Sequence, residues 1–129
     1  MRPPGEQLPR EHRLKRRSEF LRAQREGEHV HTRHYLIVVI ARPEGPCRLG
    51  ITTTKKVATA VGRNRIKRVL REVFRRNRDL FPEACDVVVI AKSGAAELGY
   101  EACLAELARA RRALTAASRK AQARPSQAR

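Results

Sequence analysis

The sequence predicts one α+β domain, a two-layer sandwich in which helices pack against a small sheet. Its 129 residues are the length of a single domain. Three segments show helical spacing of apolar residues and three others are short β-branched runs, in the order helix-strand-strand-helix-strand-helix. There are no internal repeats, and a chain with this order of elements is typical of such a sandwich.

The N-terminal half begins with an arm and continues with three predicted elements. Residues 1–12 are rich in proline and polar residues, so we expect a flexible basic arm. A helical period follows over residues 13–25, and two runs rich in β-formers cover residues 34–41 and 47–54. The segment between these runs, residues 42–46, contains two prolines and a glycine and is predicted to be a turn. The two strands are therefore expected to pair as an antiparallel hairpin.

The C-terminal half supplies a long helix, a third strand and a last helix. The apolar stripe of the long helix consists of Ile66, Val69, Leu70, Val73 and Phe74. Pro82 breaks this helix, and residues 86–92 are apolar enough for a central strand. Residues 100–118 are rich in Ala and Leu and are predicted to be helical. Residues 119–129 hold four cations and no acid and are expected to be disordered, so the folded domain spans residues 13–118.

The net charge of the chain points to a polyanionic partner. The formal charge is +16 and the pI is about 11.4. Such an excess repels itself in a compact state, so nucleic acid is the first candidate partner and an anionic membrane surface the second. No apolar run reaches the length of about 18 residues that spans a bilayer, and the charged N-terminus lacks the apolar core of a secretory signal.

The cysteines and histidines do not predict a metal site. Three cysteines, odd in number and widely spaced, are expected to be buried reduced thiols of a cytoplasmic protein: Cys47, Cys85 and Cys103. His29, His31 and His34 form H-x-H-x-x-H, but no Cys or acid follows at ligand spacing. The acids are scattered, without a cluster to hold two metal ions. We therefore predict neither a catalytic nor a metal-binding residue.

The long helix is the most basic part of the chain. Residues 63–78 include eight Arg or Lys, and Glu72 is their only acid. Lys67 with Arg71 and Arg71 with Arg75 are like-charged i,i+4 pairs, which cost about 0.2–0.5 kcal/mol each. A helix that retains this repulsion is predicted to bind a polyanion rather than to be only a solvated surface.

Folded RNA fits this helix better than a membrane or DNA. A membrane-bound helix needs an apolar face free to enter lipid, whereas this one needs its apolar face for the core. Arg outnumbers Lys, and the planar guanidinium suits phosphates, while Asn64 adds an amide that can donate and accept. No helix-turn-helix partner or dimerising heptad accompanies the helix, so DNA is disfavoured.

The segment KKVATAVGRNRIKRVLREVF, residues 55–74, resembles the arginine-rich motif of the protein subunit of bacterial ribonuclease P. The family pattern is a lysine pair at the end of a strand, a short connection, and R-N-R-x-K-R-x-x-R. The matching residues are Lys55, Lys56, Arg63, Asn64, Arg65, Lys67, Arg68 and Arg71. RLKRRSEF, RLGITTTKK, DVVVIAK and YEACLAEL extend the resemblance over about residues 13–115.

The resemblance implies both fold details and function. It implies a mixed sheet whose parallel strands are joined by a left-handed crossover, against the usual rule of handedness. It also implies a cytoplasmic subunit, in one or two copies, that joins a catalytic RNA and assists removal of the 5′ leader of precursor tRNA. The implied chemistry belongs to the RNA with Mg²⁺, bound mainly by the RNA, and no organic cofactor, membrane or DNA is implied.

The resemblance further assigns site residues. The eight motif residues above would contact the catalytic RNA. The leader would lie in a cleft between the N-terminal helix and the sheet, and the residues assigned to it are Phe20, Tyr35, Arg13, Lys15 and Arg16. Aromatic residues suit this role because base stacking tolerates any sequence. The alternative for Phe20 is core packing.

The chain departs from the family pattern at five positions. Gln24 and Val38 stand where aromatic residues are usual, and Ala58-Thr59 stands where Gly-Asn is typical. Gly62 replaces a larger residue. We expect the leader to be held less by stacking and more by charge.

Two other classes of protein remain as alternatives. A ribosomal or ribosome-assembly protein would have a similar size, charge and tails. A small basic DNA-binding module would need a docking motif that the chain lacks. The R-N-R motif with its flanking strands favours the ribonuclease P subunit.

Overall fold

The computed structural model describes residues 13–14, 17–42 and 45–123. The predicted N-terminal arm, Lys15, Arg16 and residues 124–129 of the predicted tail lie outside the described residues. Within the described part, the order is α1, β1, β2, β3, α2, β4, α3 and α4, with short 3-10 turns η3 before β4 and η4 after it. The predicted α+β class is confirmed.

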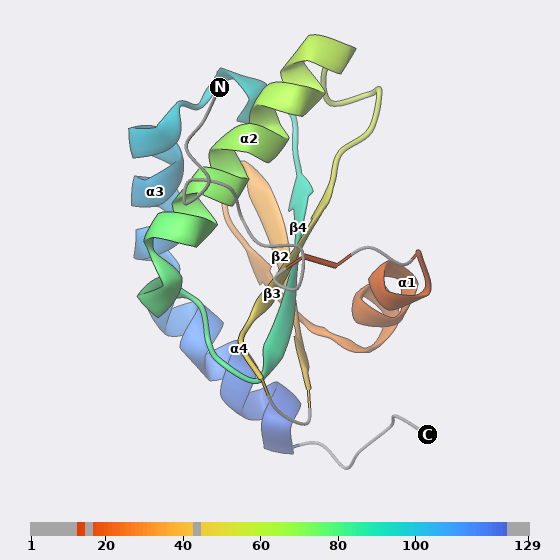
Figure 1. The fold of residues 1–129 in the computed structure, drawn as a ribbon, viewed down its shortest axis with the longest axis vertical. Coiled ribbons are helices and arrows are strands. Elements are labelled where there is room, and N and C mark those ends of the chain that lie inside the picture. Colours follow the sequence, from red (N-terminus) through yellow and green to blue (C-terminus); the bar gives the residue numbers. More distant parts are fainter. Residues whose placement is uncertain (1–12, 15–16, 43–44, 124–129) are drawn as a thin grey trace.

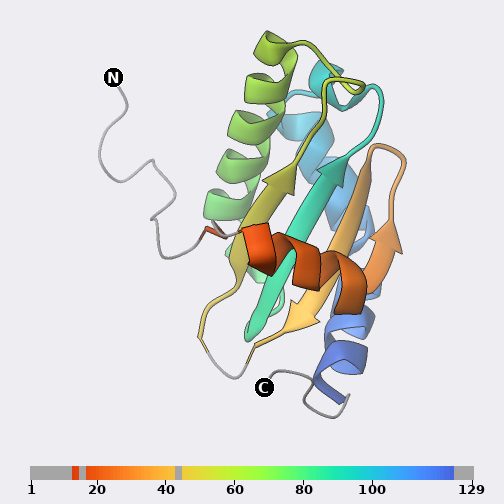
Figure 2. The same cartoon turned by 90° about the vertical axis from the view of Figure 1, so that its right-hand side faces the viewer.

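The sheet has four strands, and the central one is β4. The strands are β1 (Glu28–His31), β2 (Tyr35–Ala41), β3 (Arg48–Thr52) and β4 (Cys85–Ala91). Their spatial order is β1-β2-β4-β3, with β2 antiparallel to β1 and β4, and β3 parallel to β4. Figure 2 shows this mixed sheet face-on behind α1. The sheet is therefore mixed, and the prediction of a central third strand is confirmed.

The predicted hairpin between the second and third strands is wrong. β4 pairs with β2 along one edge and with β3 along the other, so it separates them. The physical reason is that β4 is apolar on both faces and is buried along nearly its whole length, which requires a neighbour on each side. β3 and β4 are joined through α2, and the handedness of this crossover stays a prediction.

The helices lie on both faces of the sheet. They are α1 (Arg17–Glu26), α2 (Ala60–Arg76), α3 (Tyr100–Arg109) and α4 (Arg111–Ala123). The 3-10 turns are η3 (Arg78–Leu80) and η4 (Ala95–Glu97). Figure 1 shows α1 alone on one side of the sheet and the other three helices on the opposite side. The predicted two layers thus gain a small third one, because α1 covers part of the second sheet face.

Two elements of the N-terminal part differ from the predictions. The first strand, β1, was not expected because Val30 is its only buried residue. α1 begins at Arg17 rather than at residue 13, since Arg13 and Leu14 instead form a parallel bridge to Leu49. The Leu14 N–H donates to the Leu49 carbonyl at 2.9 Å.

The predicted last helix is divided, and it also runs further than expected. α3 and α4 are separated at Ala110, whose N–H bonds the carbonyls of Ala108 and Leu107. α4 continues through residues 119–123, so the prediction that these residues are disordered is wrong. Two contacts hold this end of the helix: Ser118 Oγ lies 3.4 Å from Cys85 Sγ, and Gln122 Nε2 donates to the Glu83 carbonyl at 3.3 Å.

Alternation along β2 divides the core into two clusters. Tyr35, Ile37 and Val39 face the large cluster beneath α2, α3 and α4. Leu36, Val38 and Ile40, which alternate with them, belong to the small cluster beneath α1. The three cysteines are buried and free, as predicted, and burial raises the pKa of each thiol, that of Cys103 to about 11.

A buried ion pair attaches α1 to the sheet. The Arg48 guanidinium donates from Nε and Nη2 to the two carboxylate oxygens of Asp86, each at 2.8 Å. Its Nη2 also donates to Glu19 on α1 at 3.1 Å. Asp86 is only 6% exposed, so this fork-to-fork geometry satisfies a carboxylate that would otherwise be costly to bury.

Glu106 on α3 holds the turn between β1 and β2. Its carboxylate is buried and accepts hydrogen bonds from the Thr32 hydroxyl at 2.6 Å and the His34 backbone N–H at 2.7 Å. His34 Nδ1 lies 2.7 Å from the other carboxylate oxygen. Burial raises the pKa of Glu106, but the hydrogen bonds from Thr32 and His34 outweigh it, so the pKa lies below its usual value.

We predict that Glu106→Gln removes part of the acid sensitivity of folding. Because the pKa of Glu106 is lower in the folded state, its contribution to stability is complete above the unfolded pKa of about 4.3 and is lost as pH falls through the folded value. The variant should unfold with a free energy lower by about 1–3 kcal/mol at pH 7, and this difference should shrink below about pH 4. Urea unfolding across a pH series measures both quantities.

Glu83→Gln is the matched control, since Glu83 is an exposed glutamate. The Glu83→Gln variant should show the same dependence of unfolding free energy on pH as the wild-type protein. A Glu106→Gln deficit that stays constant from pH 7 to pH 3 would contradict the assignment.

Candidate nucleic-acid interface

The orientation of α2 is set by its apolar stripe. Ile66, Leu70, Val73 and Phe74 are buried in the large core cluster, as the sequence predicted. The helix begins after Thr59, whose side-chain oxygen accepts a hydrogen bond from the Gly62 N–H at 3.2 Å. With this stripe turned to the sheet, the cations of the helix lie on its flanks and outer face.

The position before this cap does not need a glycine. Among the described non-glycine residues, only Ala84 has a positive φ. Ala58 and Thr59, which replace the Gly-Asn of the family pattern, therefore start the helix without backbone strain. Gly62 packs closely on the η4 turn, because an added Cβ there would lie 2.9 Å from Ala58 Cβ and 3.3 Å from Ala96 Cβ.

A stripe of polar side chains runs along the outer face of α2. Asn64, Arg68, Arg71 and Arg75 follow one another at helical spacing, and the first two are exposed. Arg71 is half-buried, and burial together with the charge of Arg13 lowers its pKa. The stripe thus concentrates positive charge, which raises the electrostatic free energy of the isolated protein. An anionic partner would remove that cost.

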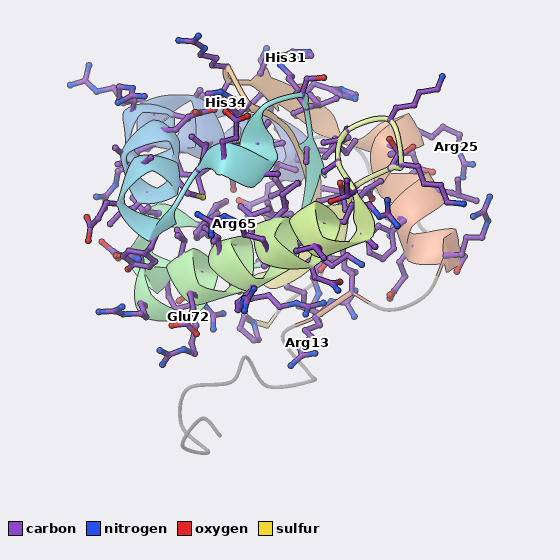
Figure 3. The ribbon with its side chains drawn as sticks, turned by 90° about the horizontal axis from the view of Figure 1, so that it is seen from above. Arg13, Arg25, His31, His34, Arg65 and Glu72 are labelled. Carbon is purple, nitrogen blue, oxygen red and sulfur yellow. The ribbon has the colours of Figure 1, made fainter. Side chains whose placement is uncertain are left out.

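Two motif arginines also have partners inside the protein. Arg63 Nη1 donates to the Ala58 carbonyl at 2.9 Å, and Arg65 Nε donates to the Ala96 carbonyl in η4 at 2.9 Å. Figure 3 shows Arg65 on the side of α2 that faces η4, and Arg13 on the other side. Arg65 therefore links the motif to the segment after β4, a contact that spacing alone could not predict.

The lysine pair extends the cationic surface beyond the start of α2. Lys55 and Lys56 lie in an exposed turn that follows β3 and is closed by the Val57 N–H on the Thr54 carbonyl at 3.0 Å. Neither lysine, nor Lys67 or Arg68, makes an ion pair with any described residue.

One exposed residue of this surface was not predicted from the sequence. Val61 is 79% exposed, four residues before Arg65 and seven before Arg68. Its helical spacing to these two arginines was the available signal. We name the whole set the α2 surface, and it consists of Lys55, Lys56, Val61, Arg63, Asn64, Arg65, Lys67, Arg68 and Arg71.

The sheet face beside α1 is a second candidate surface. His31, Leu36, Ile90 and Thr52 are partners in register across all four strands, with His31 exposed and the others half-buried. In the adjacent row, Val38, Val88 and Gly50 are buried on the side of the sheet that α1 covers. We name the row from His31 to Thr52 the open row.

Phe20 borders the open row. Its ring packs on Gly50, where an added Cβ would lie 2.8 Å from the ring, so this glycine makes room for the aromatic side chain. The ring is half-buried, and thus both packs against the sheet and presents an edge to solvent. Gln24, one turn further along α1, is exposed.

The predicted position of Tyr35 beside α1 is wrong. Tyr35 is 1% exposed and faces the large core cluster, on the opposite side of the sheet. Burial raises the pKa of its phenol, and Cys103 is its hydrogen-bond partner. Alternation along β2 is the reason, because a shift of one residue moves a side chain to the other face. Leu36 occupies the face that Tyr35 was expected to line.

The other residues predicted to bind the leader, and the histidines, lie in different parts of the structure. Arg13 bridges to β3 near Arg71, whereas Lys15 and Arg16 lie outside the described residues. His34 pairs with Glu106 and His31 lies at the end of the open row (Figure 3). Within residues 13–14, 17–42 and 45–123, no group of three His, Cys, Asp or Glu is arranged to hold a metal ion. No helix in these ranges has both the length and the apolar character needed to cross a bilayer.

The fold and the α2 surface together are typical of one class of protein, the small basic α+β proteins that bind a polyanion. The family model for ribonuclease P matches residues 8–120. The chain is 42% identical over 104 residues to the ribonuclease P protein component of Desulfovibrio desulfuricans, covering 78% of this chain and 80% of the relative. It is 40% identical over 100 residues to that of Syntrophus aciditrophicus, covering 78% and 84%.

Solved structures agree with the sequence relatives. The RNase P protein of Staphylococcus aureus superposes with a TM-score of 0.69 at 30% identity, covering 76% of this chain and 90% of that one. The RNase P protein of Thermotoga maritima gives a TM-score of 0.69 at 30% identity, covering 75% and 92%.

The chain belongs to the bacterial ribonuclease P protein family. It is accordingly a protein subunit of a ribonucleoprotein endoribonuclease of tRNA processing, and RNA is its partner. The alternatives of a ribosome-assembly protein and a DNA-binding module are not supported.

We predict that the two central arginines of the motif differ in their structural role. Arg65→Ala should lower the free energy of unfolding by about 1 kcal/mol, because it removes the bond to the Ala96 carbonyl. Arg68→Ala should change it by less than about 0.5 kcal/mol, since Arg68 is exposed and without an ion pair in the described structure. Urea unfolding of the two variants measures this contrast. Equal stability losses would show that the Arg65 contact is not formed in solution.

Proposed function

We propose that the α2 surface binds the catalytic RNA of ribonuclease P. The proposed holoenzyme is cytoplasmic and removes the 5′ leader of precursor tRNA. The open row with Phe20 is proposed to hold the leader as it leaves the cleavage site.

One observation carries the proposal for α2. Lys55 and Lys56 lie in the turn before α2, Lys67 and Arg68 lie on α2, and none of the four has an ion pair among the described residues. Folded RNA offers phosphates at fixed positions, and each phosphate neutralised releases counterions. The exposed amide of Asn64 adds a group that can both donate and accept hydrogen bonds.

The open row suits a single strand of variable sequence. Its half-buried Leu36 and Ile90 form an apolar floor, and the Phe20 ring packs on Gly50 in the neighbouring row. Apolar and stacking contacts accept any base, as an enzyme that processes many precursors requires. Arg13 adds a cation near Arg71 of the α2 surface.

The described side chains do not fit a protein-held Mg²⁺ site. Both carboxylate oxygens of buried Asp86 accept hydrogen bonds from Arg48. The carboxylate of buried Glu106 is hydrogen-bonded to Thr32 and His34. We propose that the RNA supplies the metal ligands and the chemistry. The role proposed for the protein is to bind the RNA and the leader.

Reconstitution tests the proposed function. The catalytic RNA from the same source, a 5′-extended precursor tRNA and this protein are combined at low Mg²⁺. We expect cleavage at the mature 5′ end only when RNA and protein are both present. Cleavage by the protein alone would overturn the division of roles. Absence of any effect of the protein on cleavage would overturn the proposed function.

We predict that Phe20→Ala selectively weakens binding of the holoenzyme to leader-bearing precursor. Loss of one stacked base costs about 1–3 kcal/mol, which corresponds to a loss of about 5- to 150-fold in the preference for precursor over mature tRNA. Titration of the holoenzyme with the two RNAs measures the preference. Phe20→Leu is the control that keeps an apolar group on Gly50 but removes the ring, and it should lose the preference too. A Leu variant that behaves like wild type would assign Phe20 to packing alone.

A further inference from the structure

A second cationic surface lies on α3 and α4. It consists of Arg109, Arg112, Arg119 and Lys120, which are all exposed, and we name it the α4 surface. α4 is held on the sheet by Leu114, Ala117 and Ser118, which are buried against the side of β2 and β1. The opposite side of the helix therefore faces outward.

Helix α4 itself contains no acidic residue to balance its cations. Residues 107–123 contain five Arg or Lys and no Asp or Glu. Arg111 meets Asp79 at 3.7 Å, but both side chains are more than half exposed, so this pair contributes little. The other four cations make no ion pair with any residue that the structure describes. Solvated helices usually mix both signs of charge, and α2 shows the same imbalance.

The exposed side chains between these cations are small. Ala113, Thr115, Ala116 and Ala123 surround Arg112 and Arg119, which lie seven residues and about 10 Å apart on one side of the helix. Small side chains allow a phosphate backbone to approach the helix closely, while the two guanidinium groups reach separate phosphates.

A lipid surface fits this helix poorly. An interfacial helix inserts bulky apolar side chains beside its cations. The large exposed hydrophobic residues in the described chain are Leu21 and Val61, and neither lies on α3 or α4.

The two cationic surfaces approach each other where α3 packs on α2 and Arg111 meets Asp79, and they diverge towards the start of α2 and the end of α4. α2 packs toward β3 and α4 toward β1, the strands at opposite edges of the sheet. In Figure 1 the start of α2 and the end of α4 lie at opposite ends of the fold. One contact region of RNA at the start of α2 would therefore leave the end of α4, with Arg119 and Lys120, free.

We propose that the α4 surface binds the phosphate backbone of a second, separate RNA segment, so that the protein bridges two segments of the ribonucleoprotein. This proposal rests on the proposed binding of the catalytic RNA by the α2 surface. The two surfaces divide the task, because α2 has the amide and the lysine turn beside its arginines, whereas α4 offers charge alone.

The test is the salt dependence of full-chain binding to the catalytic RNA. Arg112→Gln with Arg119→Gln should reduce the slope of log affinity against log salt by up to about two units. Arg112→Lys with Arg119→Lys keeps the charges and should retain the slope. Arg25→Gln with Arg33→Gln removes two exposed charges outside both surfaces and is the control for net charge. Circular dichroism melts check that all three double variants fold.

A tethered cleavage reagent locates the contact. The native thiols are buried, so a cysteine introduced by Ala116→Cys is labelled selectively with a hydroxyl-radical source. We expect cuts in an RNA segment distinct from the one cut from Val61→Cys. Equal slope loss in the Arg25/Arg33 control, or no cuts from position 116, would overturn the bridge. If wild-type protein does not bind the RNA, the proposed function itself fails. If substitutions at Lys67 and Arg68 weaken binding to the catalytic RNA but those at Arg112 and Arg119 do not, the proposed function stands and only the proposed bridge is wrong.

Discussion

The burial of the apolar stripe of α2 is the constraint on which the surface chemistry of this protein depends. Ile66, Leu70, Val73 and Phe74 can reach the core in only one rotation of the helix. That rotation places Asn64 and the neighbouring cations outside, irrespective of their mutual repulsion. The hydrophobic effect, at about 1.5–3 kcal/mol for each large side chain, exceeds the repulsion between like-charged neighbours. Packing thus holds the charges ready for a polyanion.

The central position of β4 separates the two candidate surfaces of the molecule. As β4 is apolar on both faces, the sheet supports the α2 layer on one side and α1 with the open row on the other. The Arg48–Asp86 pair joins β3 to β4 and reaches α1 through Glu19. The α2 surface and the open row can therefore be built on one small domain without sharing side chains.

Local patterns predicted the parts of the structure that depend on neighbouring residues in the chain. The apolar stripe and the cations of α2 are local, and both were placed correctly. Strand pairing is not local, so the insertion of β4 between β2 and β3 was missed. β1 was missed because its pattern includes a single buried residue, Val30. Tyr35 was assigned to the wrong face because alternation divides the side chains of a strand between two faces but does not say which face each helix layer covers. The bond from Arg65 to Ala96 spans 31 residues and leaves no sequence signal.

The bridge between Arg13 and Leu49 has a consequence for self-association. An exposed edge strand is a template on which a second chain can add, and β3 is an edge of this sheet. The segment before α1 pairs with that edge through Leu14 and Leu49. The other edge, β1, has only four residues and carries Glu28 and two histidines. Neither edge offers a long unpaired strand within the described chain, so sheet extension into amyloid-like polymers is disfavoured even at high concentration.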